Sequence, residues 1–211
     1  KKIDCKKFNP YNLLAQHYFF KENLKFKTKH NYGINSKDIF IFGPGKINKK
    51  VIDIITNHKL KFNSIIIGTN INQFQYEQII DMRAFCHPIR ILSQSYYIKN
   101  YKKKIIMPFS MLQNDLKQNF KKNKNILDYG FMLQDNSFLV NKNYCIFPKP
   151  LVLPYAISAA INFRATKVYL AGFEGYKDNI TSKIDTSAEV IDIILREYSN
   201  KILTLTDSNY N

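Results

Sequence analysis

The chain alternates short apolar runs with longer stretches in which apolar residues recur at helical spacing. Runs rich in β-branched and aromatic residues, as in buried strands, occupy residues 38–42, 64–68, 104–107, 144–147 and 167–171. Shorter strands are predicted at 83–86 and 202–205, and helices at 49–55, 73–82, from about 110, at 151–163 and at 187–198. Strands separated by single helices pair in parallel through right-handed crossovers. We therefore predict a doubly wound, Rossmann-like α/β domain over residues 37–211.

Two segments depart from this alternation. Residues 1–36 mix aromatic and lysine residues at roughly helical spacing, which predicts a helical arm or linker. The sequence begins at Lys1 without an initiator methionine, so we expect it to start inside a longer polypeptide or after a segment that is omitted or removed. Residues 126–140 show alternating stretches that predict a β-hairpin with its turn at 134–137.

The charge is strongly positive but lacks the pattern of a nucleic-acid-binding protein. Lysine and arginine total 32 against 16 acidic residues, so the net charge is +16 and the pI is about 9.6. The arginines, which make most bidentate contacts to phosphates and bases, are only Arg83, Arg90, Arg164 and Arg196. The lysines are dispersed and accompany many Asn and Ile residues, as a biased genome composition would produce. We expect no specific nucleic-acid partner, although such a field still attracts anionic ligands or an acidic membrane surface.

Apolar content and cysteine usage restrict the class further. At 45% hydrophobic residues the chain can bury a core, and no apolar run approaches the roughly 18–20 residues that span a bilayer. Cys5, Cys86 and Cys145 are too few and too scattered for a disulfide framework. We expect buried free thiols in a reducing compartment, and hence a cytoplasmic domain.

The first candidate site is the turn Gly43-Pro44-Gly45-Lys46, directly after a predicted strand. Ligands of open α/β sheets bind at the carboxyl ends of the strands. Glycines let backbone amides approach a phosphate, and Lys46 would add a cation. The alternative is a plain tight turn, because the sequence is neither GxGxxG nor a P-loop.

Carboxamides follow the next strand, at Asn70 and Asn72. Their side chains can donate to and accept from a base, a ribose or a sugar hydroxyl, or they can simply cap the next helix. His87 and Arg90, three residues apart, would supply an acid/base or hydrogen-bond donor and a cation for a carboxylate or phosphate. A structural histidine before Pro88 is the alternative.

The last candidate loop carries Glu174 and Tyr176 between and after two glycines. Glu174 would accept sugar hydroxyls or act as a base, and Tyr176 would stabilise a leaving phosphate, unless the loop is only a turn. The sequence holds no Ser-His-Asp, HExxH or kinase set, and His58 lies in lysine-rich surroundings without a partner pattern. Nothing near Cys86 and His87 would complete a metal site. We expect the turns around 43, 70, 87 and 174 to share one cleft.

These segments, taken in order, resemble a known bacterial domain. They are Ile41-Phe42-Gly43-Pro44-Gly45, Thr69-Asn70, Arg83-Ala84-Phe85-Cys86-His87-Pro88-Ile89-Arg90, Tyr155-Ala156-Ile157 and Val168-Tyr169-Leu170-Ala171-Gly172-Phe173-Glu174-Gly175-Tyr176. From residue 36 to 211 the chain resembles the C-terminal domain that follows an aldolase-type (HMG-CoA-lyase-like) TIM barrel in proteins of surface-polysaccharide and lipopolysaccharide gene clusters. That domain is more distantly similar to sialyltransferases of the Campylobacter type.

The resemblance implies glycosyl transfer from a nucleotide-sugar of the CMP-sugar type, with an aldolase domain in the same polypeptide. It places contacts to the cytidine nucleotide on Gly43, Gly45, Asn70 and Tyr176. The chain departs from the family where Ile47 replaces a serine, where Glu174 replaces an aspartate, and in residues 178–211, which contain no lid histidine. A non-catalytic module that binds a nucleotide or sugar acid, or docks on the aldolase, is therefore the alternative, and the oligomeric state stays open.

Overall fold

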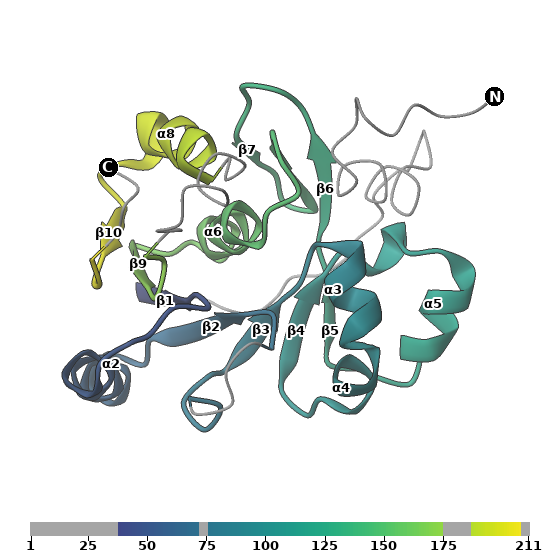
Figure 1. Ribbon diagram of the computed structural model, residues 1–211, viewed down its shortest axis with the longest axis horizontal. Helices are drawn as coiled ribbons and strands as arrows, with labels where there is room; N and C mark the ends of the chain where they lie inside the picture. The colour runs from purple at the N-terminus through teal and green to yellow at the C-terminus, as the bar shows by residue number, and fades with distance from the viewer. Residues whose placement is uncertain (1–37, 72–75, 175–186, 208–211) are drawn as a thin grey trace.

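The computed structural model describes residues 38–71, 76–174 and 187–207. Seven strands form one parallel sheet in the order β10-β9-β1-β2-β3-β4-β5. The strands are β1 (Asp38–Phe42), β2 (Ile65–Thr69), β3 (Met82–Ala84), β4 (Lys104–Met107), β5 (Ile126–Asp128), β9 (Lys167–Ala171) and β10 (Ile202–Thr204). Figure 1 shows α2 on one side of this sheet and α6 and α8 on the other. Helices on both faces of a parallel sheet confirm the predicted doubly wound α/β fold.

The helices join these strands in the order the apolar pattern predicts, with two additions. They are α2 (Lys49–Phe62), α3 (Pro88–Ser93), α4 (Ser95–Asn100), the 3-10 turn η1 (Phe109–Met111), α5 (Asn114–Phe120), α6 (Val152–Asn162) and α8 (Ser187–Tyr198). The helix predicted at 73–82 is wrong over its described part, because residues 76–79 form a turn and Met82 already belongs to β3. The pair α3–α4 was missed. Pro88 stands at the first turn of α3, where its missing amide costs nothing.

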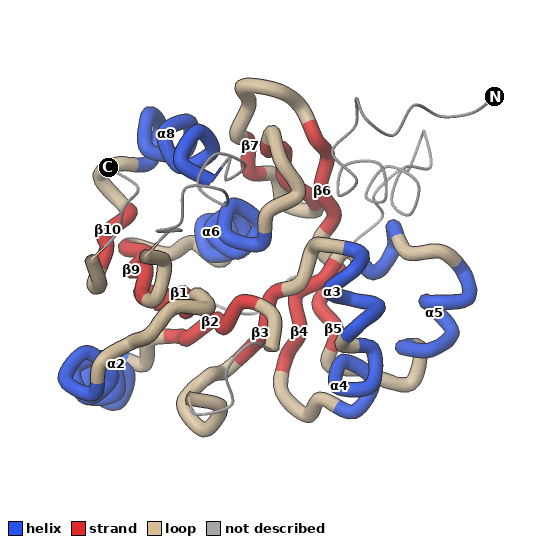
Figure 2. The backbone as a smooth tube through the Cα atoms, viewed as in Figure 1, coloured by secondary structure: helices blue, strands red, loops and turns tan. Residues whose placement is uncertain are grey.

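A second, three-stranded sheet replaces the predicted hairpin. It contains β6 (Gly130–Leu133), β7 (Leu139–Val140) and β8 (Tyr144–Phe147) in the order β6-β8-β7. Because β8 lies between them, β6 and β7 are not partners, and the hairpin prediction for 126–140 is wrong. Helix α6 contacts β7 and β8, and Figure 2 shows β7 next to α6 and β6 farther from it.

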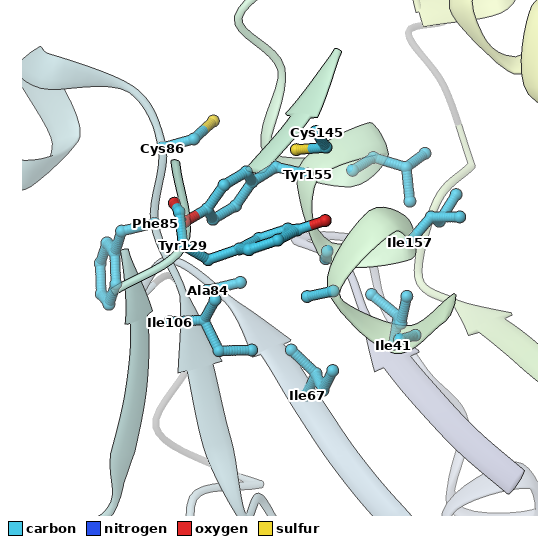
Figure 3. Close-up of a cluster of buried hydrophobic side chains, with 14 of the residues drawn as sticks. Ile41, Ile67, Ala84, Phe85, Cys86, Ile106, Tyr129, Cys145, Tyr155 and Ile157 are labelled. Atoms are coloured by element: carbon cyan, nitrogen blue, oxygen red, sulfur yellow. The ribbon is translucent and has the colours of Figure 1, made fainter. Parts of the chain in front are cut away.

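The core divides between the two faces of the sheet because side chains alternate along each strand. Ile39 and Ile41 of β1 belong to the larger cluster with α6 and α8, whereas Phe40 and Phe42 pack in a smaller cluster with Ile55 of α2. In Figure 3 the ring of Tyr129 lies between the sheet and α6, next to the ring of Tyr155, which α6 itself carries. None of the described helices is long and apolar enough to cross a membrane. The predicted arm at 1–36 lies outside the described residues.

Candidate functional site at the carboxyl edge of the sheet

Four of the predicted loops lie along one edge of the main sheet. Strands β9, β1, β2 and β3 are consecutive neighbours and all parallel, so their carboxyl ends share an edge. The loops that follow them begin at Gly172, Gly43, Asn70 and Phe85. The chain leaves β1 towards β2 on one side and returns to β9 on the other, so strand order reverses between β1 and β9. This reversal is where doubly wound sheets place their ligands. We call the side where the strands end the carboxyl edge, and the opposite side the amino edge.

The glycine turn after β1 is packed against the loop after β9. The amide of Gly43 donates to the Ala171 carbonyl oxygen and that of Gly45 to the Gly172 carbonyl oxygen, both at 2.8 Å. A Cβ atom on Gly43 would lie 2.3 Å from the Gly172 carbonyl oxygen, and Gly172 itself has a φ of +75°. Glycine is required here for close backbone approach.

This packing corrects the role predicted for the two glycines. Their amides are already bonded within the protein, so they are not the donors that a phosphate cradle requires. The plain-turn alternative describes Gly43 and Gly45, and Lys46 remains as an exposed cation just before α2. Helix α2 is capped by Asn48, whose Oδ1 accepts the Val51 amide at 2.9 Å.

Asn70 carries the clearest sign of a binding site. The residue is in the left-handed conformation, with a φ of 50°, and its amide donates to the Ala84 carbonyl oxygen at 3.0 Å. Only 7% of the residue is exposed. Its side-chain oxygen Oδ1 is buried, yet it accepts no hydrogen bond from any residue that the structure describes. Buried acceptors are normally satisfied, so an orphan of this kind calls for a ligand or a water.

A buried arginine holds Asn70 in place. The Nη1 atom of Arg83, on β3, donates to the Asn70 carbonyl oxygen at 2.6 Å, and the residue is 3% exposed. The Nη2 atom of Arg83 pairs with Glu77, which also accepts a hydrogen bond from the Tyr101 hydroxyl. A Cβ atom on Gly68 would lie 2.8 Å from Arg83 Nη1, so the glycine makes room for the guanidinium. Sequence reasoning missed this role; an arginine and a glycine inside apolar strand runs were the available signal.

His87 immediately precedes α3, and its side chain caps the first turn of that helix. Its Nδ1 accepts the Ile89 amide at 3.3 Å. The pKa of His87 is lowered by burial and, secondly, by the neighbouring charge of Arg90. The ring is therefore neutral at pH 7, and because Nδ1 is an acceptor its proton lies on Nε2. Of the two predicted roles, this geometry favours the hydrogen-bond donor over the base. The charge of Arg90 acts on His87, as expected for two residues three positions apart.

The remaining predicted residues are divided between described and undescribed segments. Glu174 is half-buried and directly follows Phe173. The ring of Phe173 packs against Gly43, where an added Cβ atom would lie 2.8 Å from the ring. Asn72 and Tyr176 lie outside the described residues. Ser110, after β4 on the same edge, was not predicted; its buried Oγ also has no hydrogen-bond partner in the described part of the chain.

A serine, a histidine and an aspartate meet at the amino edge, contrary to our reading of His58. Its Nδ1 lies 2.9 Å from Ser64 Oγ, and its Nε2 lies 3.3 Å from Asp38 Oδ2. The residue preceding β2, Ser64, is only 3% exposed, and Asp38 opens β1, so the cluster lies opposite the carboxyl edge. A nucleophile must reach its substrate. The cluster therefore ties α2 to the starts of two strands and does not resemble a hydrolytic site.

The thiols of Cys86 and Cys145 are buried and free, as predicted. Burial raises the pKa of both, so they are inert neutral groups of the core near Tyr155 (Figure 3). Among the described residues no group of three or more His, Cys, Asp or Glu side chains is placed to hold a metal ion.

No known family model matches the chain, and no curated protein matches it significantly.

Proposed function

We propose that the chain binds a nucleotide or nucleotide-sugar at the carboxyl edge, as the nucleotide-binding domain of a glycosyltransferase of bacterial surface-glycan synthesis. The observation that carries the proposal is the buried, unpartnered Oδ1 of Asn70. It stands one strand away from the reversal of strand order between β1 and β9. The class of reaction rests on the resemblance to sialyltransferase-like domains.

Asn70 would recognise a group that donates a hydrogen bond. A ribose hydroxyl and the exocyclic amine of cytosine are both donors of the required kind, and a carboxamide oxygen is their natural acceptor. Because Arg83 and the Ala84 carbonyl oxygen fix the backbone of Asn70, only its side chain would have to turn for the buried Oδ1 to meet a ligand. Such preorganisation increases affinity by lowering the entropy cost of binding.

The charges for a phosphate would come from side chains, since the glycine amides are engaged. Lys46 and Arg90 are exposed and follow two of the four loops. Under this proposal the Nε2–H of His87 would donate a hydrogen bond to an oxygen of the nucleotide-sugar or of the acceptor molecule whose negative charge increases in the transition state. Glu174 would orient sugar hydroxyls. Transfer itself would break the bond between the anomeric carbon of the sugar and the nucleotide phosphate oxygen, releasing the nucleotide. The same carbon would form a bond to the oxygen of an acceptor hydroxyl, whose proton would pass to the Glu174 carboxylate or to solvent.

A binding module without turnover is the second candidate, favoured because residues 178–211 contain no histidine that could serve as the lid histidine of the sialyltransferases. It predicts nucleotide binding without transfer to any acceptor. Both candidates share the site at Asn70, and neither uses the amino edge.

The test is a thermal-shift panel of CMP, UDP and CMP-linked sugars with the full chain and two variants. A ligand at about 100 times its Kd stabilises by about 2.7 kcal/mol, a rise in Tm of roughly 5–10 °C for a domain of this size. Asn70→Gly keeps the left-handed backbone and removes the acceptor, so affinity should fall about tenfold.

The matched control is Asn63→Gly, the same substitution at a left-handed asparagine that ends α2 at the amino edge. It should bind as the wild type does. No shift with any nucleotide, or equal losses in both variants, would contradict the proposal. Nucleotide binding without transfer to glycan acceptors would select the non-catalytic candidate.

A further inference from the structure

A cluster of unpaired lysines lies at the amino edge, far along the sheet from His58. Its members are Lys99, Lys102, Lys104, Lys121, Lys122 and Lys124, which we call the lysine corner. All six are exposed. None of them forms an ion pair with any residue in the described part of the chain. The corner is therefore a concentration of free positive charge within a sequence whose lysines otherwise look dispersed.

Asparagine side chains hold the two loops of the corner together. Asn123 Nδ2 donates to the Ile98 carbonyl oxygen at 2.6 Å, and Asn125 Nδ2 donates to that of Lys102 at 2.9 Å. The strands that follow, β4 and β5, are paired neighbours. The loop after α4 and the loop after α5 are thus fixed side by side, as Figure 1 shows for the two helices.

Two acidic residues of the neighbouring turn before β3 are already engaged. Glu77 pairs with Arg83, and Asp81 pairs with Lys59 at 2.6 Å. Lys103, inside the same loop, differs from its neighbours because its ammonium donates to the carbonyl oxygens of Glu77 and Ile80. Backbone carbonyl oxygens thus hold the ammonium of Lys103, whereas no hydrogen bond or ion pair within the described part of the chain holds the ammonium groups of the six corner lysines.

Exposed aromatic side chains adjoin the positive charge. Tyr96 of α4 is 74% exposed and shares a helix face with Lys99, and Tyr97 beside it is 46% exposed. Their rings meet edge to face, with centroids 5.8 Å apart. Leu92 of α3 is exposed as well. Tyrosine rings prefer the headgroup region of a bilayer, where one end of the ring is apolar and the other wet.

We propose that the lysine corner, with Tyr96 and Tyr97, docks the protein on a membrane surface rich in anionic phospholipids. Lysine is a point charge that suits a diffuse layer of headgroups, and each lysine near the surface contributes about fivefold to partitioning. A nucleic-acid surface would favour arginine, and the described residues of this corner contain none. Docking by the amino edge leaves the carboxyl edge open, and it does not depend on the function proposed for that edge.

The test measures flotation of the full chain with vesicles of mixed phosphatidylglycerol and phosphatidylcholine and with vesicles of pure phosphatidylcholine. Only the anionic vesicles should bind, and added salt should weaken the binding. The variant K102Q/K122Q/K124Q should lose about 100-fold in partitioning to anionic vesicles. The control K49Q/K50Q/K142Q changes the charge equally at exposed lysines elsewhere and should lose only a small part of that.

Tyr96→Ala separates a bilayer from another polyanion. It should weaken vesicle binding several-fold and leave binding of a single-stranded RNA oligonucleotide unchanged. Equal losses for the two triple variants would overturn the proposal, because binding would then follow net charge alone. Binding of the RNA that exceeds vesicle binding and depends on the same three lysines would overturn it in favour of a nucleic-acid surface.

Discussion

The two edges of the main sheet satisfy their buried polar groups in different ways. At the amino edge His58 uses both ring nitrogens, on Ser64 and Asp38, and Asp81 accepts from Lys59 and from the Ile66 amide. At the carboxyl edge Asn70 is held by its backbone while its side-chain oxygen has no partner among the described residues. A closed network indicates structure, whereas a buried orphan beside a reversal of strand order indicates a ligand.

A second difference concerns the backbone. The turns at the carboxyl edge approach each other so closely that side chains are excluded, as Gly43 and Gly172 show. No glycine that the structure describes lies at the amino edge; there, side chains such as His58 and Lys59 make the connections. The carboxyl edge is thus a rigid backbone frame around one polar side chain, and the amino edge is a surface joined by side chains.

The largest expected effect breaks that frame. Gly43→Ala places a Cβ atom 2.3 Å from the Gly172 carbonyl oxygen and 2.8 Å from the Phe173 ring, so the two loops must separate. We expect a loss of about 2–3 kcal/mol in the free energy of unfolding, measured by urea denaturation. Lys46→Ala, exposed at the end of the same turn, should change it by less than about 0.5 kcal/mol. Wild-type stability in Gly43→Ala would mean that the loops are not packed as described.

The next prediction compares one variant at each edge. His58→Ala leaves the buried Ser64 hydroxyl without its partner and removes a ring that packs against Phe40 and Phe62. Stability should fall by about 2 kcal/mol while nucleotide binding is retained. Asn70→Gly should do the reverse, with a change in stability below about 0.5 kcal/mol, because it removes an acceptor that the protein leaves unsatisfied. Denaturation and ligand titration of both variants measure this, and parallel losses would show that the edges do not differ in role.

The sequence is enough to predict the strands of both edges, but it does not reveal the contacts that distinguish them. In apolar runs such as the one ending at Phe42 the strand pattern is stronger than any helix or turn pattern. The order of these runs along the chain predicts the parallel sheet. His58 and Asp38 are 20 positions apart and Asn70 and Arg83 are 13 apart, so no local spacing records either contact. Pairing of β6 with β8 is non-local in the same way.

Local sequence patterns also led to wrong predictions where one residue type is suited to two different structural roles. Glycines at 43 and 45 are equally consistent with a phosphate cradle and with close packing of two loops, and only the partners of their amides decide between the two. The helices α3 and α4 are short and carry tyrosines and serines that dilute the apolar period, so their spacing predicts nothing. That Asn70 Oδ1 has no hydrogen-bond partner among the described residues is a consequence of three-dimensional packing, so no pattern of residues predicts it.

The smallest expected effect concerns protons at the carboxyl edge. Burial lowers the pKa of His87 below its ordinary value of 6.5, and the charge of Arg90 lowers it further. As the pH falls below 6.5 the unfolded chain therefore binds a proton before the folded protein does, and stability decreases. His87→Asn retains a side chain that can accept the Ile89 amide but does not titrate. Urea midpoints measured from about pH 7.5 to about pH 5 should fall less steeply in the variant than in the wild type, because one of the groups that titrate in this range is gone. A steeper fall in the variant would require His87 to be charged in the folded protein, which would replace the neutral donor at this edge by a cation.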